Sequence, residues 1–82
     1  MPNTNQICGR MFRYVRFKKG MSQQNMANYL RVNQSTVSKI EKGIHFPQID
    51  TLNKLLSLSG HTLKELCSLS FEARWRGRVL EE

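Results

Sequence analysis

The sequence predicts an all-α fold, a bundle of five helices followed by a short helical extension. Apolar residues recur at helical spacing, glycines and prolines separate these stretches, and no stretch alternates like a half-buried strand. A chain of 82 residues has room for one small domain. We therefore expect a single domain over residues 1–69 and a helical C-terminal tail over residues 70–82.

The first two helices are expected at residues 5–19 and 23–30. Gly20 gives the first helix a C-terminal stop, and Ser22 is a good N-cap for the second. Each helix has one apolar face that can point into a core. These faces consist of Ile7, Cys8, Met11, Phe12 and Val15 in the first helix and of Met26, Ala27 and Leu30 in the second.

The third helix is expected at residues 34–42, between a cap at Asn33 and a stop at Gly43. Val32 and Val37 flank the cap at the spacing of a hydrophobic staple. Because a link of only three residues, Arg31 to Asn33, joins the second and third helices, the two must cross steeply. This is the geometry of a helix-turn-helix.

The fourth helix is expected at residues 49–58, and the fifth runs from a capping box at Thr62 and Glu65 to about Leu69. The apolar face of the fourth helix consists of Leu52, Leu55 and Leu56. The tail places Phe71, Trp75 and Val79 four residues apart, in a stripe too apolar to leave in water. We expect this stripe to cover its own domain or a partner.

The outward face of the third helix carries the clearest indication of function. At about 100° per residue, its outward side chains fill a continuous arc of about 140° that contains no acid. These side chains are Gln34, Ser35, Ser38, Lys39 and Lys42. Glutamine can bond an adenine edge, serine can bond either kind of base, and lysine can reach guanine or phosphate. A plain solvated polar face is the alternative.

The charge of the chain is one-sided. Residues 1–40 contain seven Lys and Arg and no Asp or Glu, whereas residues 41–82 contain six basic and six acidic residues, so the net charge of +7 comes from the first half. Such a distribution suits a polyanion, with nucleic acid as the first candidate. A solvated face or a patch for an anionic membrane has the same composition.

Other classes of function are disfavoured. Cys8, His45, His61 and Cys67 show none of the close spacings that build zinc sites, and no pairing of titratable residues suggests catalysis. We therefore expect no metal, no cofactor and no enzymatic activity. No apolar run is long enough for a membrane span, the start lacks a signal peptide, and two cysteines are too few for a disulfide scaffold. We expect free thiols and a cytoplasmic location.

The stretch SQQNMANYLRVNQSTVSKIEKG, followed by P-x-I-x-T-L and T-L-K-E-L, resembles the Cro/phage-repressor (lambda repressor-like) helix-turn-helix family. The resemblance runs from Cys8 to Cys67 and implies a five-helix bundle whose third helix enters the major groove of DNA. It implies that Gln34, Ser35 and Ser38 read bases, with Lys39 one position further along.

The resemblance also implies roles for residues around the third helix. Gln23 would bond phosphate and steady the first base-reading residue, and Arg16 and Glu41 would form a buried ion pair. Arg31 stands where this family usually has glycine, so a non-glycine residue would have to adopt a left-handed backbone there. Two alternatives stay open: the turn is distorted, or the Arg31 side chain is useful against phosphate. Lys42 is assigned to phosphate contact as well.

The resemblance implies a sequence-specific DNA-binding transcriptional regulator, most simply a repressor that binds an inverted repeat of double-stranded DNA as a homodimer. Dimer contacts are expected from Ile44, Phe46, Phe71, Trp75 and Val79. Three alternatives stay open: a DNA-binding antitoxin whose main role is to mask a partner protein, a controller of a restriction-modification operon, and a basic module that binds RNA or anionic membrane without sequence preference.

Overall fold

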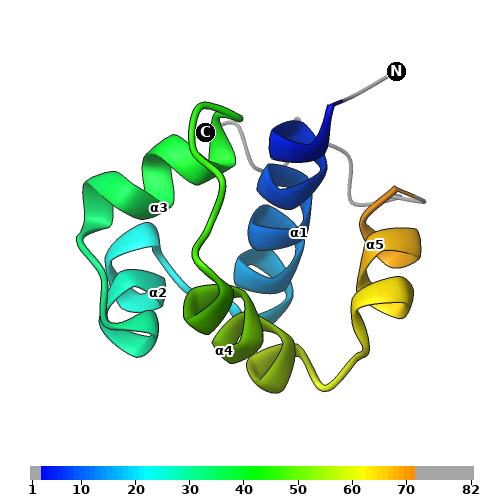
Figure 1. Ribbon diagram of the computed structural model, residues 1–82. Helices are drawn as coiled ribbons and strands as arrows, with labels where there is room; N and C mark the ends of the chain where they lie inside the picture. The colour runs from blue at the N-terminus through cyan, green and yellow to red at the C-terminus, as the bar shows by residue number, and fades with distance from the viewer. Residues whose placement is uncertain (1–2, 72–82) are drawn as a thin grey trace.

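The computed structural model describes residues 3–71, in which five helices pack around one core (Figure 1). The helices are α1 (Thr4–Lys19), α2 (Gln23–Leu30), α3 (Gln34–Glu41), α4 (Ile49–Ser59) and α5 (Leu63–Phe71). No strand occurs in this part of the chain, and the expected five-helix all-α fold is confirmed. Trp75, Val79 and the rest of the expected extension beyond Phe71 lie outside the described residues.

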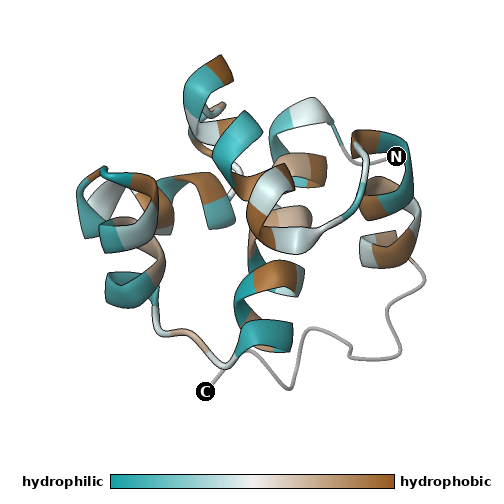
Figure 2. Cartoon of the chain, turned by 90° about the horizontal axis from the view of Figure 1, so that it is seen from below, coloured by the Kyte–Doolittle hydropathy of each residue, from teal (hydrophilic) through white to brown (hydrophobic). Residues whose placement is uncertain are grey.

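The arrangement of the helices places α3 at the surface. α1 runs through the middle of the bundle and packs against α3, α4 and α5, while α2 packs against α3 and α4 (Figure 1). The hydrophobic parts of the helices mostly turn toward the middle of the bundle (Figure 2). The core consists of Met11, Phe12, Val15, Met26, Ala27, Leu30, Val37, Ile40, Leu52, Leu55 and Leu66. Among these helices, none is long and apolar enough to cross a membrane.

Capping boxes fix the beginnings of three helices. α1 begins one residue before its expected start because Asn3 Oδ1 accepts from the Gln6 N–H at 2.8 Å while Gln6 Oε1 accepts from the Asn3 N–H at 3.0 Å. Ser22 caps α2 in the same way. The expected box at α5 is confirmed, since Thr62 and Glu65 bond each other's backbone N–H groups at 3.1 and 3.2 Å. The N–H of Thr62, with His61 beside it, lowers the pKa of the Glu65 carboxyl.

The beginning of α3 differs from the expectation. Asn33 occupies the N-cap position, but its side chain makes no hydrogen bond to the helix, so the predicted side-chain cap is wrong. The side chain instead lines an open groove beside the helix. At the other end, α3 stops at Glu41 rather than Lys42, which is the C-cap residue.

The turn between α2 and α3 contains the left-handed residue that the sequence predicts. Arg31 has φ 62° and ψ 46°, and it is the one non-glycine residue with positive φ among residues 3–71. Its conformation lets the N–H of Val32 donate to the Ala27 carbonyl at 3.0 Å. Ala27 is fully buried.

α1 and α3 approach each other closely at Gly9. A Cβ atom at this position would lie 2.7 Å from the carbonyl oxygen of Ile40 and 2.9 Å from that of Glu41. Because both neighbours are backbone atoms, neither can rotate away. Glycine therefore sets how near the end of α3 lies to α1.

We expect Gly9→Ala to destabilise the fold by about 1 to 3 kcal/mol, even though alanine is the better helix former, because the added methyl group overpacks this crossing. Chemical denaturation measures the change. Gly60→Ala is the matched control: Gly60 has positive φ but nothing within 4 Å of its Cβ position, so it reports backbone strain alone. A Gly9→Ala variant more stable than the parent protein would contradict the assigned close approach.

Candidate nucleic-acid interface

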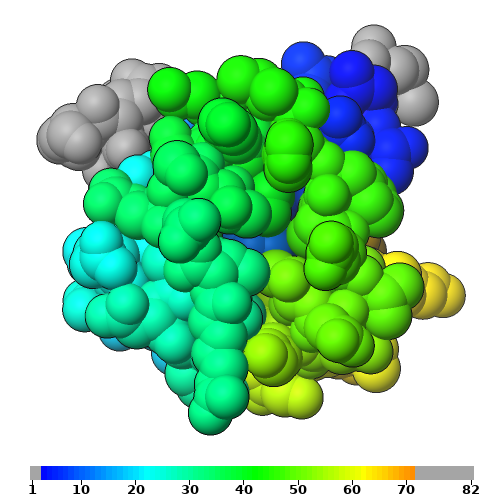
Figure 3. Space-filling model, turned by 60° about the vertical axis from the view of Figure 1, so that its left-hand side comes forward, coloured from blue at the N-terminus to red at the C-terminus, as the bar shows by residue number. Residues whose placement is uncertain are grey.

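The outward face of α3 lies on one side of the bundle beside α2, in the part of the molecule that Figure 3 turns toward the viewer. Gln34, Ser35 and Lys39 are exposed and Ser38 is half-buried. Lys42 follows the helix directly and is exposed too. The side of α3 that faces the core consists of Val37, Ile40 and Glu41, all of which are buried.

Glu41 is the only acid in α3, and its carboxylate turns into the protein. Arg16 holds it through two parallel hydrogen bonds, from Nε to Oε2 at 2.8 Å and from Nη2 to Oε1 at 3.0 Å. The side chain of Glu41 is 2% exposed and that of Arg16 is 17% exposed. Arg16 also donates to the carbonyl of Met21 at 3.3 Å. One guanidinium therefore connects α1, the loop before α2, and α3.

Two glutamines link this ion pair to the surface. Gln23, the first residue of α2, donates from Nε2 to Glu41 Oε1 at 3.1 Å. Gln34, the first residue of α3, donates from Nε2 to Gln23 Oε1 at 3.4 Å. The structure thus brings Arg16 and Glu41 together with Gln23 and Gln34 in one hydrogen-bonded chain.

A second arginine, for which the sequence favours a solvated position on the outside of the first helix, lies next to the same carboxylate. Arg13 Nε is 3.9 Å from Glu41 Oε1, and its side chain is 34% exposed. Arg13 precedes Arg16 by three residues on α1, so the two side chains lie on neighbouring parts of one helix face. That spacing was the available indication in the sequence.

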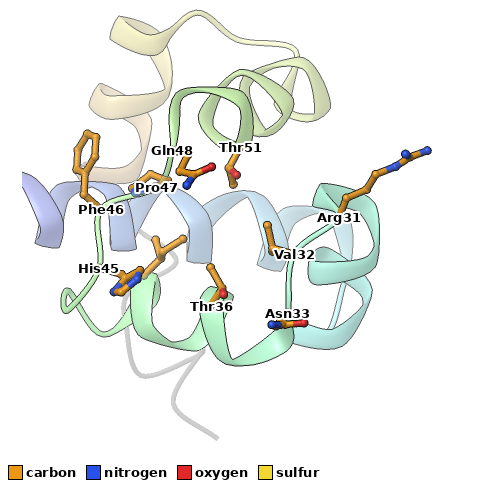
Figure 4. A pocket seen from close by; sticks show the side chains of 10 residues that line it. Arg31, Val32, Asn33, Thr36, His45, Phe46, Pro47, Gln48 and Thr51 are labelled. Atoms are coloured by element: carbon orange, nitrogen blue, oxygen red, sulfur yellow. The ribbon is translucent and has the colours of Figure 1, made fainter.

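An open groove of about 590 Å³ lies beside α3, between this helix and the segment that leads into α4 (Figures 3 and 4). It is lined by Arg31, Val32, Asn33, Thr36, Ile40, His45, Phe46, Pro47, Gln48 and Thr51. Arg31 and His45 are the only titratable residues among them, and the Arg31 side chain extends away from the bundle (Figure 4). This lining offers no acid and base pair for catalysis.

Of the two cysteines, Cys8 is buried and Cys67 is half-buried. Burial raises the pKa of the Cys8 thiol, and the nearby Cys67 raises it further. Cys8 therefore stays protonated and is a poor nucleophile at neutral pH. Within residues 3–71, no group of three His, Cys, Asp or Glu side chains could hold a metal ion.

The polar and cationic outer face of α3, with the acid of this helix buried, is typical of a DNA-binding helix-turn-helix protein. The comparison with protein families agrees. The helix-turn-helix family HTH_3 matches residues 12–66, and the chain belongs to this family. It is a DNA-binding transcriptional regulator.

The solved structures contain a protein of the same fold. The crystal structure of a tyrosine-to-phenylalanine mutant of the restriction-modification controller protein C.Esp1396I superposes with a TM-score of 0.69 at 16% sequence identity. The superposition covers 100% of this chain and 99% of the controller protein. No curated protein sequence matches the chain.

We expect Arg16→Ala to lower the free energy of unfolding by about 3 to 5 kcal/mol, because it leaves the buried Glu41 carboxylate without its main partner. Thermal or chemical unfolding measures this loss. Lys19→Ala, an exposed substitution on the same helix, is the control and should change stability little. An Arg16→Ala protein of unchanged stability would mean that water or Arg13 replaces the lost hydrogen bonds.

Arg31→Gly should separate stability from DNA binding. Glycine removes left-handed strain of about 1 to 2 kcal/mol but costs about 0.5 to 1 kcal/mol of chain entropy, so stability should stay equal or rise slightly. DNA affinity should fall if the Arg31 side chain contacts phosphate. Arg31→Ala keeps the strained backbone and should lose affinity without the gain in stability. Equal unfolding free energies for the glycine and alanine variants would argue against strain at this turn.

Proposed function

We propose that this regulator is a repressor that acts as a homodimer on an inverted repeat, reading bases with α3 in the major groove. One observation carries the proposal: the exposed face of α3 has no acid, since Glu41 is buried against Arg16. A negative charge on that face would repel the phosphates that border the groove. A helix of this width and surface chemistry fits a major groove of about 12 Å.

The proposed division of roles follows from position along α3. Gln34, Ser35 and Ser38 lie on the first turns of the helix, the part that meets base edges when such a helix enters the groove, and Lys39 is adjacent. These four residues are proposed to read bases. Because every one can bond a base edge directly, each should influence preference at one or two positions.

Three further residues are proposed to bind the DNA backbone. Arg31 is the C-cap of α2 in the turn before α3, and Lys42 is the C-cap of α3. Both are exposed, and both are proposed to reach phosphates that border the groove. Gln23 opens α2, whose free backbone N–H groups favour a phosphate. Such contacts position the protein without specifying sequence.

A homodimer is proposed because one recognition helix reads only a few base pairs. Two copies about 34 Å apart read two half-sites and multiply the discrimination. Ile44 and Phe46, in the loop after α3, are 62% and 49% exposed, and Phe71 at the end of α5 is 43% exposed. We assign the dimer contact to these residues together with Trp75 and Val79. A cytoplasmic location and the absence of catalysis belong to the same proposal.

The likeness in fold to a restriction-modification controller protein favours one second candidate, the control of a restriction-modification operon. The DNA-binding chemistry would be the same. The two candidates differ in the genes that the operator precedes, so mapping the bound sites in the source genome separates them.

Base reading is tested by comparing Gln34→Ala with Lys42→Ala. The site is first selected from a randomised duplex library, and binding is then measured to every single-base variant of it. We expect Gln34→Ala to lose about 1 to 3 kcal/mol at one position per half-site and to accept other bases there, whereas Lys42→Ala should weaken all variants alike. A uniform loss in Gln34→Ala would contradict base reading by this residue.

The dimer contact is tested by sedimentation equilibrium at micromolar concentration. Phe46→Ser should raise the dimer dissociation constant, because it removes an exposed aromatic side chain from the proposed surface. Tyr29→Ser is the control, since Tyr29 is similarly exposed at 47% but lies on α2. A Phe46→Ser protein that stays dimeric would contradict the proposed dimer contact. A parent protein that is a monomer and copurifies with an unrelated chain would indicate that the surface serves another partner, as in an antitoxin.

A further inference from the structure

A second open groove lies where α1 meets α5, and both cysteines of the chain line it. Its volume is about 430 Å³, and α1, α4, α5 and the segment before α4 form its walls. The lining is mostly apolar and includes Ile7, Met11 and Leu52. Cys8 belongs to α1 and Cys67 to α5. The groove therefore brings together two thiols from nearly opposite ends of the described chain.

The two thiols influence each other but differ in their access to solvent. α1 and α5 pack side by side (Figure 1), and negative charge on Cys67 adds to the effect of burial in raising the pKa of the Cys8 thiol. Cys8 is only 5% exposed, whereas Cys67 is half-buried. A small reagent that enters the groove therefore reaches Cys67 first.

This difference in access orders the two steps by which a peroxide oxidises a pair of thiols. The Cys67 thiolate attacks one oxygen of hydrogen peroxide, the O–O bond breaks, and the released hydroxide takes up the thiol proton, which leaves a sulfenic acid and water. The Cys8 thiol then loses its proton, its sulfur attacks the Cys67 sulfur, and the sulfenic oxygen leaves as a second water. Overall, two thiols become one disulfide and one peroxide is reduced to two waters.

Cys8 is suited to the second step in spite of its burial. A sulfenic acid in its neutral form no longer carries the negative charge of Cys67 that raises the pKa of Cys8. The attack is also intramolecular, so no second reagent has to enter the core. We propose that Cys8 and Cys67 form a redox-sensitive pair, which a peroxide converts into a disulfide that joins α1 to α5. The inference goes beyond the proposed function and does not depend on DNA binding.

The disulfide would constrain nearly all of the described chain, because it links the first helix to the last one of residues 3–71. A cross-link that closes so long a loop stabilises a protein mainly by restricting its unfolded state. We therefore expect the oxidised protein to melt on the order of 10 °C above the reduced protein.

The test treats the full-length protein with hydrogen peroxide and then alkylates the remaining thiols with iodoacetamide. Mass spectrometry should find a single chain that is lighter than the reduced protein by two hydrogen atoms and carries no alkyl group. Peptide mapping should find the peptide of Cys8 joined to the peptide of Cys67. Dithiothreitol should restore both thiols and return the melting temperature to its starting value.

The matched variants are Cys67→Ala and Cys8→Ala. Peroxide should leave the melting temperature of Cys67→Ala unchanged, with its buried Cys8 still a thiol. In Cys8→Ala the reaction should stop at the sulfenic acid of Cys67, which dimedone captures. If Cys8→Ala does not fold, the peptide map of the parent protein decides. Oxidation of Cys67 beside a free Cys8 in the parent protein, a disulfide between two chains, or two intact thiols would each overturn the inference.

Discussion

The bidentate ion pair between Arg16 and Glu41 is the interaction on which the arrangement of the site depends. It joins α1 to the end of α3, and its hydrogen bonds extend to the loop before α2 and to Gln23. Removing two charges from water costs free energy, and breaking a buried pair leaves that cost without the compensating attraction. The pair therefore resists any movement of α3 away from α1. Because it consumes the single acid of α3, it also leaves the outer face of that helix free of negative charge.

Two local conformational requirements complete the geometry. Gly9 lets the backbone of α3 approach α1 closely, and the Cβ atom of any other residue would meet carbonyl oxygens of α3. Arg31 accepts a left-handed backbone that glycine would adopt more easily, and it places a cation in the turn that leads into α3. Strain retained at a charged residue next to the proposed DNA-binding face is the pattern expected where function outweighs local stability.

Much of this could be predicted from the sequence, because the fold depends on short-range patterns. Helical spacing, caps and stops placed all five helices to within one or two residues, and the left-handed turn followed from Arg31 standing in a glycine position. Gly9 was missed because its importance comes from a contact with α3, which no local pattern records. The side-chain cap at Asn33 was wrong because an exposed amide can face a groove as readily as its own helix. The roles of Gln34, Ser35 and Ser38 toward DNA stay predictions.

The most direct measurement is solution NMR of the protein bound to the duplex that it selects, with nuclear Overhauser effects observed between side-chain and base protons. The account predicts contacts from the side chains of Gln34, Ser35 and Ser38 to major-groove protons of each half-site, and none from α5. Base contacts from another face of the bundle, or contacts to the sugar-phosphate backbone alone, would contradict it.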